Sequence, residues 1–364
     1  MRDESAATIP APPAAGQTPP RVASVTETYP PARTNRRNAY AALDLGTNNC
    51  RLLVAEPASH GFRVVDAFSR IVRLGEGLGT ADRLSEAAIA RTIEALRICR
   101  AKMQARGVVR AKIIATEACR LAVNGAEFVD RVQREVGLDL EIVDRQTEAY
   151  LAVTGCAALA DPYAESVVIF DIGGGSTEIA WLDGSATNPS ADPTQRIRAW
   201  DSLPVGVVTL AERHGGCEVT RLMFEGMVEE VAELLARFAI RAAPAATARH
   251  FHLLGTSGTV TTLAAMHLRL ARYERRRVDG LWMSDGEVSD AIDDLLDTRL
   301  DQRADNPCIG RDRADLVLAG CAILEAIRRA FPSERLRIAD RGLREGLLMN
   351  MMREDGVWRR GGYR

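Results

Sequence analysis

The segment from Val167 to Trp181, VVIFDIGGGSTEIAW, constrains the fold more than any other part of the chain. Four apolar residues lead into Asp171, three consecutive glycines follow Ile172, and a second run rich in β-forming residues begins at Ser176. This order predicts two antiparallel strands joined by a glycine turn. It differs from the strand, loop and helix of a Walker-type phosphate loop.

The glycine turn has the chemistry of a phosphate site. Because Gly173, Gly174 and Gly175 carry no Cβ, backbone N–H groups in the turn can approach a phosphate closely. Asp171 and Glu178 place two carboxylates beside the turn, and oxygen ligands next to a phosphate suit Mg²⁺. The simpler alternative for an isolated hairpin of this kind is a structural glycine turn with two solvated acids.

The chain contains the same pattern a second time. Residues 40–54 read YAALDLGTNNCRLLV, and an offset of 127 residues pairs Asp44 with Asp171 and Gly46 with Gly173. The turn residues that then lie opposite Gly174, Gly175 and Ser176 are Thr47, Asn48 and Asn49. A repeated hairpin predicts two similar domains, each with a phosphate-binding turn. We expect the two turns to face each other and to hold a polyphosphate and a metal ion in the cleft between the domains.

A third segment also has the pattern of an anion site. Residues 251–268, FHLLGTSGTVTTLAAMHL, read as a strand, a glycine-flanked turn and a helix. Thr256, Ser257 and Gly258 place hydroxyl and backbone N–H groups at the start of that helix, where anions bind favourably. The segment therefore predicts a third wall of the same phosphate site.

Composition excludes several classes of function. The chain has 364 residues, 46% of them hydrophobic, which is enough for two domains with cores of their own. A net charge of −2 gives no general attraction for nucleic acid or a membrane. The seven cysteines show no CxxC spacing and no HExxH motif is present, so we expect reduced thiols in a cytoplasmic protein without structural zinc.

Seven motifs, in order over about residues 40–350, resemble the exopolyphosphatase / guanosine pentaphosphate phosphohydrolase family. They are DLGTNNCRLL (44–53), RLGEGL (73–78), ATEACRLAVN (115–124), DIGGGSTEIA (171–180), PVGVVTLAE (204–212), GTSGT (255–259) and GLREGLL (342–348). The resemblance implies an α/β fold of the actin-like, sugar-kinase superfamily, with two ribonuclease H-like domains around a central cleft.

The resemblance also implies a domain organisation. Residues 39–147 would form the first domain together with a returning C-terminal helix at 343–355, and residues 148–342 would form the second domain. Residues 1–38 hold seven of the fifteen prolines, which predicts a disordered tail, and residues 356–364 are expected to be mobile. The chain resembles the short form of the family, which lacks an additional C-terminal helical region.

Particular residues take roles from the resemblance. Glu148 matches the glutamate that activates the attacking water, and Arg120 matches a phosphate-facing arginine. Thr147 stands where the family usually has a second glutamate. Three acids match metal-organising positions: Asp44, Asp171 and Glu178. The cofactor that they imply is Mg²⁺ or another divalent metal. The phosphate-binding turns match at Thr47, Asn48, Gly173, Gly174, Gly175 and Ser176.

The predicted function is hydrolysis of a phosphoanhydride by direct attack of water, with orthophosphate released from the end of inorganic polyphosphate. Conversion of guanosine pentaphosphate to tetraphosphate is the second activity that the family implies. Two alternatives remain open on the sequence alone: a kinase of the same superfamily, and a non-catalytic sensor of polyphosphate or of the alarmone. The oligomeric state also stays open, with a homodimer as one arrangement.

Overall fold

Two mixed β-sheets form the framework of the protein. The computed structural model describes residues 38–358, apart from residue 60 and residues 185–191. The predicted tail at 1–38 and the last residues, 359–364, therefore lie outside the described residues, except for residue 38. The first sheet has the order β3-β2-β1-β4-β5, with β1 (Ala39–Leu45), β2 (Asn49–Pro57), β3 (Phe62–Ile71), β4 (Val108–Ala115) and β5 (Glu141–Ile142).

The second sheet repeats this topology. Its order is β10-β11-β9-β6-β7-β8, with β6 (Ser166–Ile172), β7 (Thr177–Asp183), β8 (Ile197–Leu203), β9 (Phe251–Thr256), β10 (Trp282–Ser284) and β11 (Arg335–Ala339). In each sheet three antiparallel strands are followed by two strands parallel to the first, and the second sheet has one further edge strand, β10, which runs antiparallel to β11. The predicted pair of ribonuclease H-like α/β sheets is confirmed, whereas the exact domain boundaries stay a prediction.

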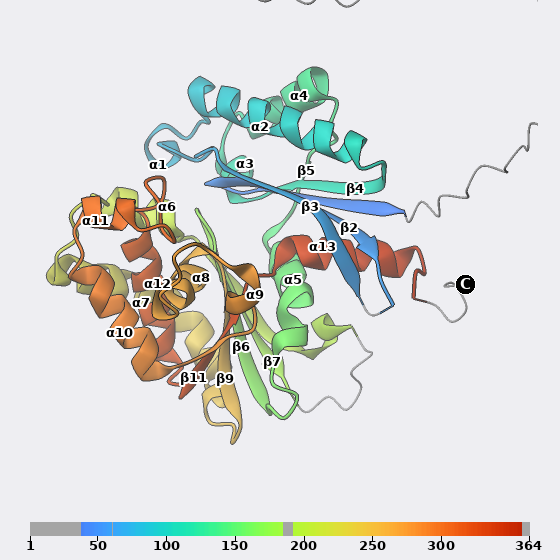
Figure 1. Ribbon diagram of the computed structural model, residues 1–364. Helices are drawn as coiled ribbons and strands as arrows, with labels where there is room; N and C mark the ends of the chain where they lie inside the picture. The colour runs from blue at the N-terminus through green and yellow to red at the C-terminus, as the bar shows by residue number, and fades with distance from the viewer. Residues whose placement is uncertain (1–37, 60, 185–191, 359–364) are drawn as a thin grey trace, which may run out of the picture. The chain divides into compact units, whose positions relative to one another are not determined.

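Helices cover both faces of each sheet (Figure 1). In the first half they are α1 (Leu78–Ala81), α2 (Glu86–Ala105), α3 (Glu117–Leu121), α4 (Gly125–Val136) and α5 (Arg145–Cys156). In the second half they are α6 (Val207–Arg213), α7 (Arg221–Ala246), α8 (Gly258–His267), α9 (Arg275–Val278), α10 (Asp285–Leu296), α11 (Leu300–Asp305), α12 (Val317–Ala330) and α13 (Leu343–Glu354). Short 3-10 helices span Ala157–Leu159 and Pro193–Arg196.

The second sheet is buried on both faces, and its central strand β6 carries the continuous apolar run 167–170. Val168 and Phe170 of β6 point into the core formed with α7 and α12, whereas Val167 and Ile169 point into the smaller core under α5. Alternate residues of a strand face opposite sides, so a continuous apolar run is what a doubly covered strand requires. Burial on both faces fixes the position of β6. Asp171 therefore has a defined place near the end of this strand, just before the glycine turn.

Helices α5 and α13 connect the two sheets and cross each other at glycines. Figure 1 shows α13 in red, beside α5 and beneath the first sheet. A Cβ on Gly155 would overlap the carbonyl oxygen of Gly342, and a Cβ on Gly346 would overlap that of Leu151. The close crossing fixes where α5 begins, and α5 carries Glu148 in its first turn.

The C-terminal end of the described chain packs against the first sheet. Val357 and Trp358 are partly buried against a core that includes Tyr40 and Leu53, and the Trp358 Nε1–H donates to the Ala58 carbonyl oxygen at 3.1 Å. This part of the segment predicted to be mobile therefore has a defined position.

In the part of the chain that the structure describes, no helix combines the length and the apolar composition needed to cross a membrane.

Candidate active site

The two predicted hairpin turns have the same backbone geometry. The Gly46 N–H donates to the Asn49 carbonyl oxygen and the Gly173 N–H donates to the Ser176 carbonyl oxygen, both at 2.9 Å. Asp44 and Asp171 each lie two residues before the glycine in the last part of a strand. The overlay at 127 residues is therefore confirmed in three dimensions.

The two turns also touch each other. A Cβ on Gly174 would lie 3.0 Å from the Thr47 Cβ and 3.1 Å from the Asn48 backbone nitrogen. The glycines of the second turn all adopt negative or extended φ values, outside the left-handed region. Glycine is required here because of this close approach, and not because the turn needs a positive φ.

Helix α6 covers the other side of the glycine turn. Its first residues donate backbone hydrogen bonds to the turn, from Val207 to the Gly173 carbonyl oxygen at 3.0 Å and from Val208 to the Gly174 carbonyl oxygen at 2.8 Å. The carbonyl groups of the turn are therefore satisfied behind it. The Gly173 N–H donates within the turn to the Ser176 carbonyl oxygen, and Gly174 and Gly175 line the pocket.

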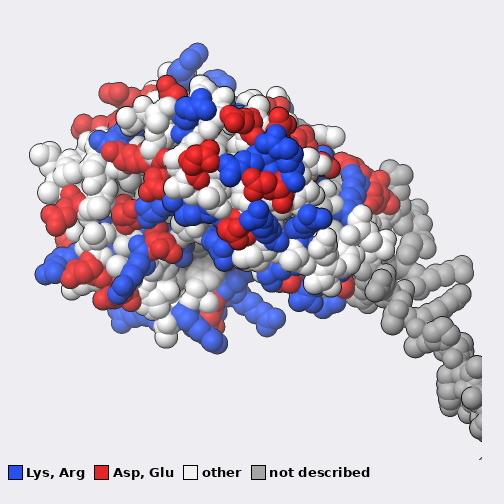
Figure 2. All heavy atoms as spheres, turned by 90° about the horizontal axis from the view of Figure 1, so that it is seen from above, with Lys and Arg blue, Asp and Glu red and all other residues white. Residues whose placement is uncertain are grey.

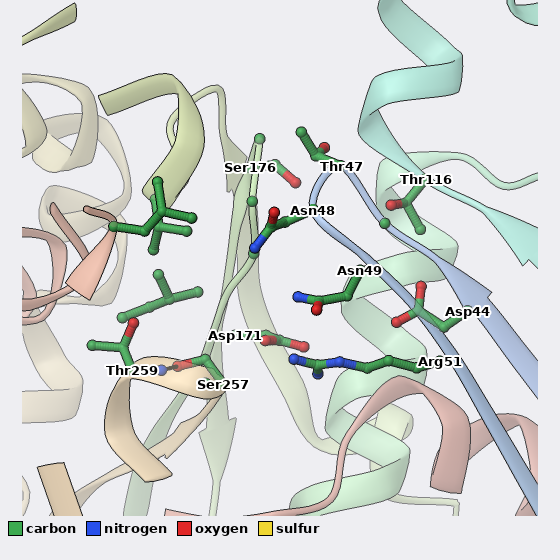
Figure 3. A pocket seen from close by; sticks show the side chains of 18 of the residues that line it. Asp44, Thr47, Asn48, Asn49, Arg51, Thr116, Asp171, Ser176, Ser257 and Thr259 are labelled. Atoms are coloured by element: carbon green, nitrogen blue, oxygen red, sulfur yellow. Dashed lines mark hydrogen bonds between the residues drawn. The ribbon is translucent and has the colours of Figure 1, made fainter. Parts of the chain in front are cut away.

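One pocket brings most of the predicted residues together (Figure 3). It contains about 970 Å³ of space, including open solvent at its mouth. The predicted residues that line it are Asp44, Thr47, Asn48, Asn49, Glu148, Asp171, Gly173, Gly174, Gly175, Ser176, Glu178, Ser257 and Gly258. They come from both sheets and from the helices α5 and α8 or the turns before them.

Two predicted residues lie outside this lining. Thr256 lines an adjoining cavity that shares Asp44 and Asp171 with the pocket, and its hydroxyl donates to the Arg341 carbonyl oxygen at 2.8 Å. The guanidinium of Arg120 donates instead to the Glu148 carboxylate, from Nη2 to Oε2 at 2.8 Å. Arg120 therefore contacts the proposed base in this structure, and its phosphate-facing role stays a prediction.

Two arginines that the sequence reasoning missed line the pocket. Arg51 lies opposite Asp44 in the β1–β2 hairpin, just as Glu178 lies opposite Asp171 in the β6–β7 hairpin. The offset of 127 residues pairs Arg51 with Glu178, so the overlay itself contained the signal for Arg51. Arg313, from the turn before α12, had no comparable signal.

The two arginines converge on the start of α8. A Cβ on Gly258 would lie 3.5 Å from Arg313 Nη1 and 4.0 Å from Arg51 Nη2. Burial and the charge of Arg51 both lower the pKa of Arg313. Two guanidinium groups and a helix N-terminus capped by Ser257 form a strongly anion-binding wall.

Ser257 holds an unusual backbone conformation at this wall. Its φ of 154° is one that residues other than glycine rarely adopt, and its side chain accepts hydrogen bonds from Thr259 N and Val260 N. Strained residues of this kind persist where the surrounding structure fixes them, often at ligand sites.

The acids of the pocket are buried close to one another. Burial, together with the charges of the nearby Asp44 and Glu148, raises the pKa of Asp171 to about 7 against the lowering effect of Arg51. Burial and the charge of Asp171 likewise raise the pKa of Glu178 to about 7. Burial, with Glu178 as the next cause, raises the pKa of Glu148 well above its ordinary value. Negative charges held together in this way favour a bound cation.

The metal site predicted at Asp44, Asp171 and Glu178 stays a prediction. Within the described residues, no three His, Cys, Asp or Glu side chains gather closely enough to hold a metal among themselves. Mg²⁺ in phosphate sites usually binds one or two carboxylates and takes its other ligands from phosphate oxygens and water. Asp44 and Asp171 supply such carboxylates at the two turns, and the buried Asn48 Oδ1 has no hydrogen-bond partner in the structure.

Solved structures of other proteins share this fold. An exopolyphosphatase-like protein is 26% identical, with a TM-score of 0.76 over 87% of this chain and 99% of that protein. The PPX-GPPA enzyme of Aquifex aeolicus is 29% identical, with a TM-score of 0.68 over 86% and 99% of the two chains. An exopolyphosphatase from Cytophaga hutchinsonii is 24% identical, with a TM-score of 0.77 over 87% and 98%, and at that identity the likeness concerns the fold alone.

A family model gives the same result from the sequence. It is described as the Ppx/GppA phosphatase family and matches residues 53–355, which include Glu148, the second glycine turn and α13. The resemblance inferred from the seven motifs is thereby confirmed. Because the match spans most of the chain, the protein belongs to the Ppx/GppA phosphatase family.

Proposed function

We propose that the protein is a metal-dependent phosphoanhydride hydrolase that releases terminal orthophosphate from inorganic polyphosphate. Guanosine pentaphosphate, converted to tetraphosphate, is the second substrate that we propose. The observation that carries the proposal is the placement of a buried carboxylate, Glu148, in the same pocket as two glycine-containing turns and two arginines.

The binding part of the mechanism rests on donors from both halves of the protein. N–H groups of the two turns, together with Arg51 and Arg313, would hold the terminal phosphoryl group and its neighbour. Phosphoryl transfer depends mainly on such positioning and charge neutralisation. Asp44 and Asp171 would hold the divalent cation, which neutralises negative charge on the phosphate oxygens when it is bound.

The hydrolytic part rests on Glu148. Its carboxylate would accept a proton from a water molecule placed in line with the scissile bond. The raised pKa of Glu148 makes its carboxylate more basic than that of an exposed glutamate. Among the described residues that line the pocket, none is His or Cys, so a Ser-His or Cys-His nucleophile has no support there, and we propose direct attack by water.

The cellular location that we propose is the cytoplasm. All seven cysteines are free and six of them are buried, as in proteins that work under reducing conditions.

A substrate panel tests the function against its two alternatives. The purified protein is incubated with Mg²⁺ and long-chain polyphosphate, guanosine pentaphosphate, or ATP with a mixture of sugars, and products are measured as orthophosphate and as sugar phosphate. We expect orthophosphate from polyphosphate and no sugar phosphate. Formation of sugar phosphate would support a kinase, and binding of polyphosphate without release of orthophosphate would support a sensor.

A further inference from the structure

Four charged side chains of alternating sign form a chain behind the pocket: Arg145, Glu117, Arg120 and Glu148. Arg145 donates to Glu117 from Nη2 to Oε1 at 2.7 Å and from Nε to Oε2 at 3.3 Å. Arg120 donates to Glu117 Oε2 from Nη2 at 2.6 Å and from Nε at 3.1 Å. The same Nη2 of Arg120 donates to Glu148 Oε2 at 2.8 Å. Only the last member, Glu148, lines the pocket.

The fold places these residues together through two neighbouring parallel strands. β4 ends at Ala115 and β5 ends at Ile142, and the Val143 N–H donates to the Ala115 carbonyl oxygen at 3.1 Å. Helix α3 starts directly after β4 and α5 starts directly after β5, so the first turns of both helices meet at one edge of the sheet. Glu117 begins α3, and Arg145 begins α5 one turn before Glu148.

Glu117 is a carboxylate buried almost completely inside the protein. It is 1% exposed, and a buried carboxylate is costly unless it is paired and hydrogen-bonded. Burial raises the pKa of Glu117, but the hydrogen bonds from Arg145 and Arg120 outweigh this effect, and the pKa lies below its ordinary value. The charge is therefore retained at neutral pH, between two guanidinium groups.

Arg120 is held in one position by protein oxygens. Its Nε and Nη2 bind Glu117, its Nη2 also binds Glu148, and its Nη1 donates to the Val143 carbonyl oxygen at 2.6 Å. A planar guanidinium with all three nitrogens bonded cannot turn away without breaking several charge-assisted hydrogen bonds. One of these bonds fixes the carboxylate of Glu148.

We propose that Glu117 is a positioning residue for the hydrolysis, and that with Arg145 it holds Arg120 on the carboxylate of Glu148. The inference rests on the proposed role of Glu148 as the base. Without Glu117, Arg120 loses two of its anchors and is free to move toward the phosphate or to rotate, so the Glu148 carboxylate loses its fixed orientation. Misplacement of a reacting group lowers the rate of the chemical step more than it changes substrate binding.

The test is a double-mutant cycle read as kcat and KM for orthophosphate release from polyphosphate. Glu117→Gln and Arg145→Gln are each made in the wild-type protein and in the Glu148→Gln protein. We expect Glu117→Gln to lower kcat about tenfold or more and to leave KM within about twofold, since Glu117 does not line the pocket. Arg145 is half exposed, so we expect a smaller loss of about threefold.

In the Glu148→Gln background both substitutions should change the residual kcat by less than about twofold, because a residue that acts only through Glu148 has nothing left to position. Glu141→Gln is the matched control, since Glu141 pairs with Lys112 on the exposed side of the same strand edge. It should leave both constants unchanged. Circular dichroism and thermal melting confirm that each variant is folded.

The outcomes separate the inference from the function on which it rests. Equal loss of kcat in both backgrounds, or no loss in a folded Glu117→Gln protein, overturns the inference. If Glu117→Gln does not fold, the Arg145→Gln cycle decides by the same criteria. Wild-type turnover in Glu148→Gln overturns the proposed base, and the positioning role with it.

Discussion

Gly174 is the residue at which the two hairpin turns meet. The Cβ of a valine there would lie only 3.0–3.2 Å from atoms of Thr47 and Asn48, which is closer than a Cβ normally approaches other atoms. We expect folded Gly174→Val to lose substrate affinity and turnover, because the turns must move apart and their N–H groups no longer face one phosphate. Isothermal titration with a short polyphosphate, together with the release assay, measures both losses.

The control for that variant is Gly226→Val. Gly226 lies in α7, and a Cβ there meets no atom within 4 Å. This variant should keep wild-type affinity and turnover. Wild-type affinity in Gly174→Val would show that the contact between the turns has no part in binding.

Asp171 gives a pH-dependent prediction in the absence of metal. Burial raises its pKa to about 7 in the folded protein, whereas an unfolded aspartate has a pKa of about 3.9. Between these values the folded state holds a proton that the unfolded state has lost, so this residue lowers stability as the pH rises. The side chain of Asp171→Asn cannot ionise. The Tm of Asp171→Asn minus the Tm of wild type should therefore increase from pH 5 to pH 7 and then level off.

Thermal melts in chelator at pH 5, 6, 7 and 8 measure this difference. Glu127→Gln, at an exposed acid outside the pocket, should follow the wild-type curve. A difference in Tm between Asp171→Asn and wild type that does not change over this range would contradict the assignment of the raised pKa.

Single residues could be predicted from the sequence where the hairpin repeat or a family motif identified them. The overlay of the hairpins located both turns, and Arg51 lay within reach of the same comparison. The link from Arg145 through Glu117 to Arg120 was not predictable, because it joins residues from two helices that only the parallel pairing of β4 and β5 brings together. Sequence spacing alone contains no information about that edge.

Among the elements, the crossing of α5 and α13 offers the sharpest test of packing. Gly346→Ala would place a methyl group on the Leu151 carbonyl oxygen, so one helix must shift. Overpacking of this kind typically destabilises a protein by about 1–3 kcal/mol, and we expect that loss in the free energy of unfolding. The shift should also reduce turnover, since α5 carries Glu148.

Gly286→Ala is the matched substitution on α10, where the new methyl group meets no atom within 4 Å. It should leave stability unchanged or raise it by about 0.4–1 kcal/mol, as replacement of a helical glycine does where there is room. Denaturant unfolding of both variants checks the pair. Equal stability of the two would show that the helices do not depend on close contact at Gly346.

Long amphipathic elements were predicted well and short polar ones were not. The helical spacing of apolar residues over 85–106 predicts a helix, and the structure has α2 there with Ser85 as its N-cap. The amphipathic pattern over 221–239 likewise predicts a helix, which is α7 and continues to Ala246 through Pro244. The segment 147–160 also reads as a helix, but α5 begins two residues earlier, at Arg145, because the side chain of Asp144 accepts the Thr147 N–H at 2.7 Å. The short α3, which carries Glu117, has too few residues for a periodic pattern.

For the molecule as a whole, the distribution of charge bears on how it handles long substrates. On the face shown in Figure 2 basic and acidic side chains are intermixed, and the net charge of the chain is −2. The described residues form no continuous basic track on this face, so we expect a long polyphosphate to be held mainly in the pocket and to dissociate between cuts. We predict distributive action and an affinity that falls with added salt.

A gel of partly digested long-chain polyphosphate measures this behaviour. A smooth ladder of intermediate lengths is the expected result, and full-length chains that coexist only with orthophosphate would contradict it. Repeating the digestion at two salt concentrations tests whether the affinity has the predicted dependence.

At this scale the sequence predicted the paired sheets and their shared pocket because the repeat of the hairpin is a property of the whole chain. It did not predict how closely the two turns approach, or that Arg120 binds Glu148 in this structure. Both depend on how the halves pack across α5 and α13. Packing of that kind follows from many weak contacts that no single motif encodes.

The proposed hydrolysis depends on activation of the attacking water by Glu148. Its most direct test is the rate of orthophosphate release by Glu148→Gln at saturating polyphosphate and Mg²⁺, with Glu127→Gln as the exposed control. General-base catalysis typically contributes about 10²–10⁴-fold, so we predict a loss of at least about 100-fold with substrate binding retained. A folded Glu148→Gln protein that keeps more than about a tenth of wild-type turnover would contradict the account.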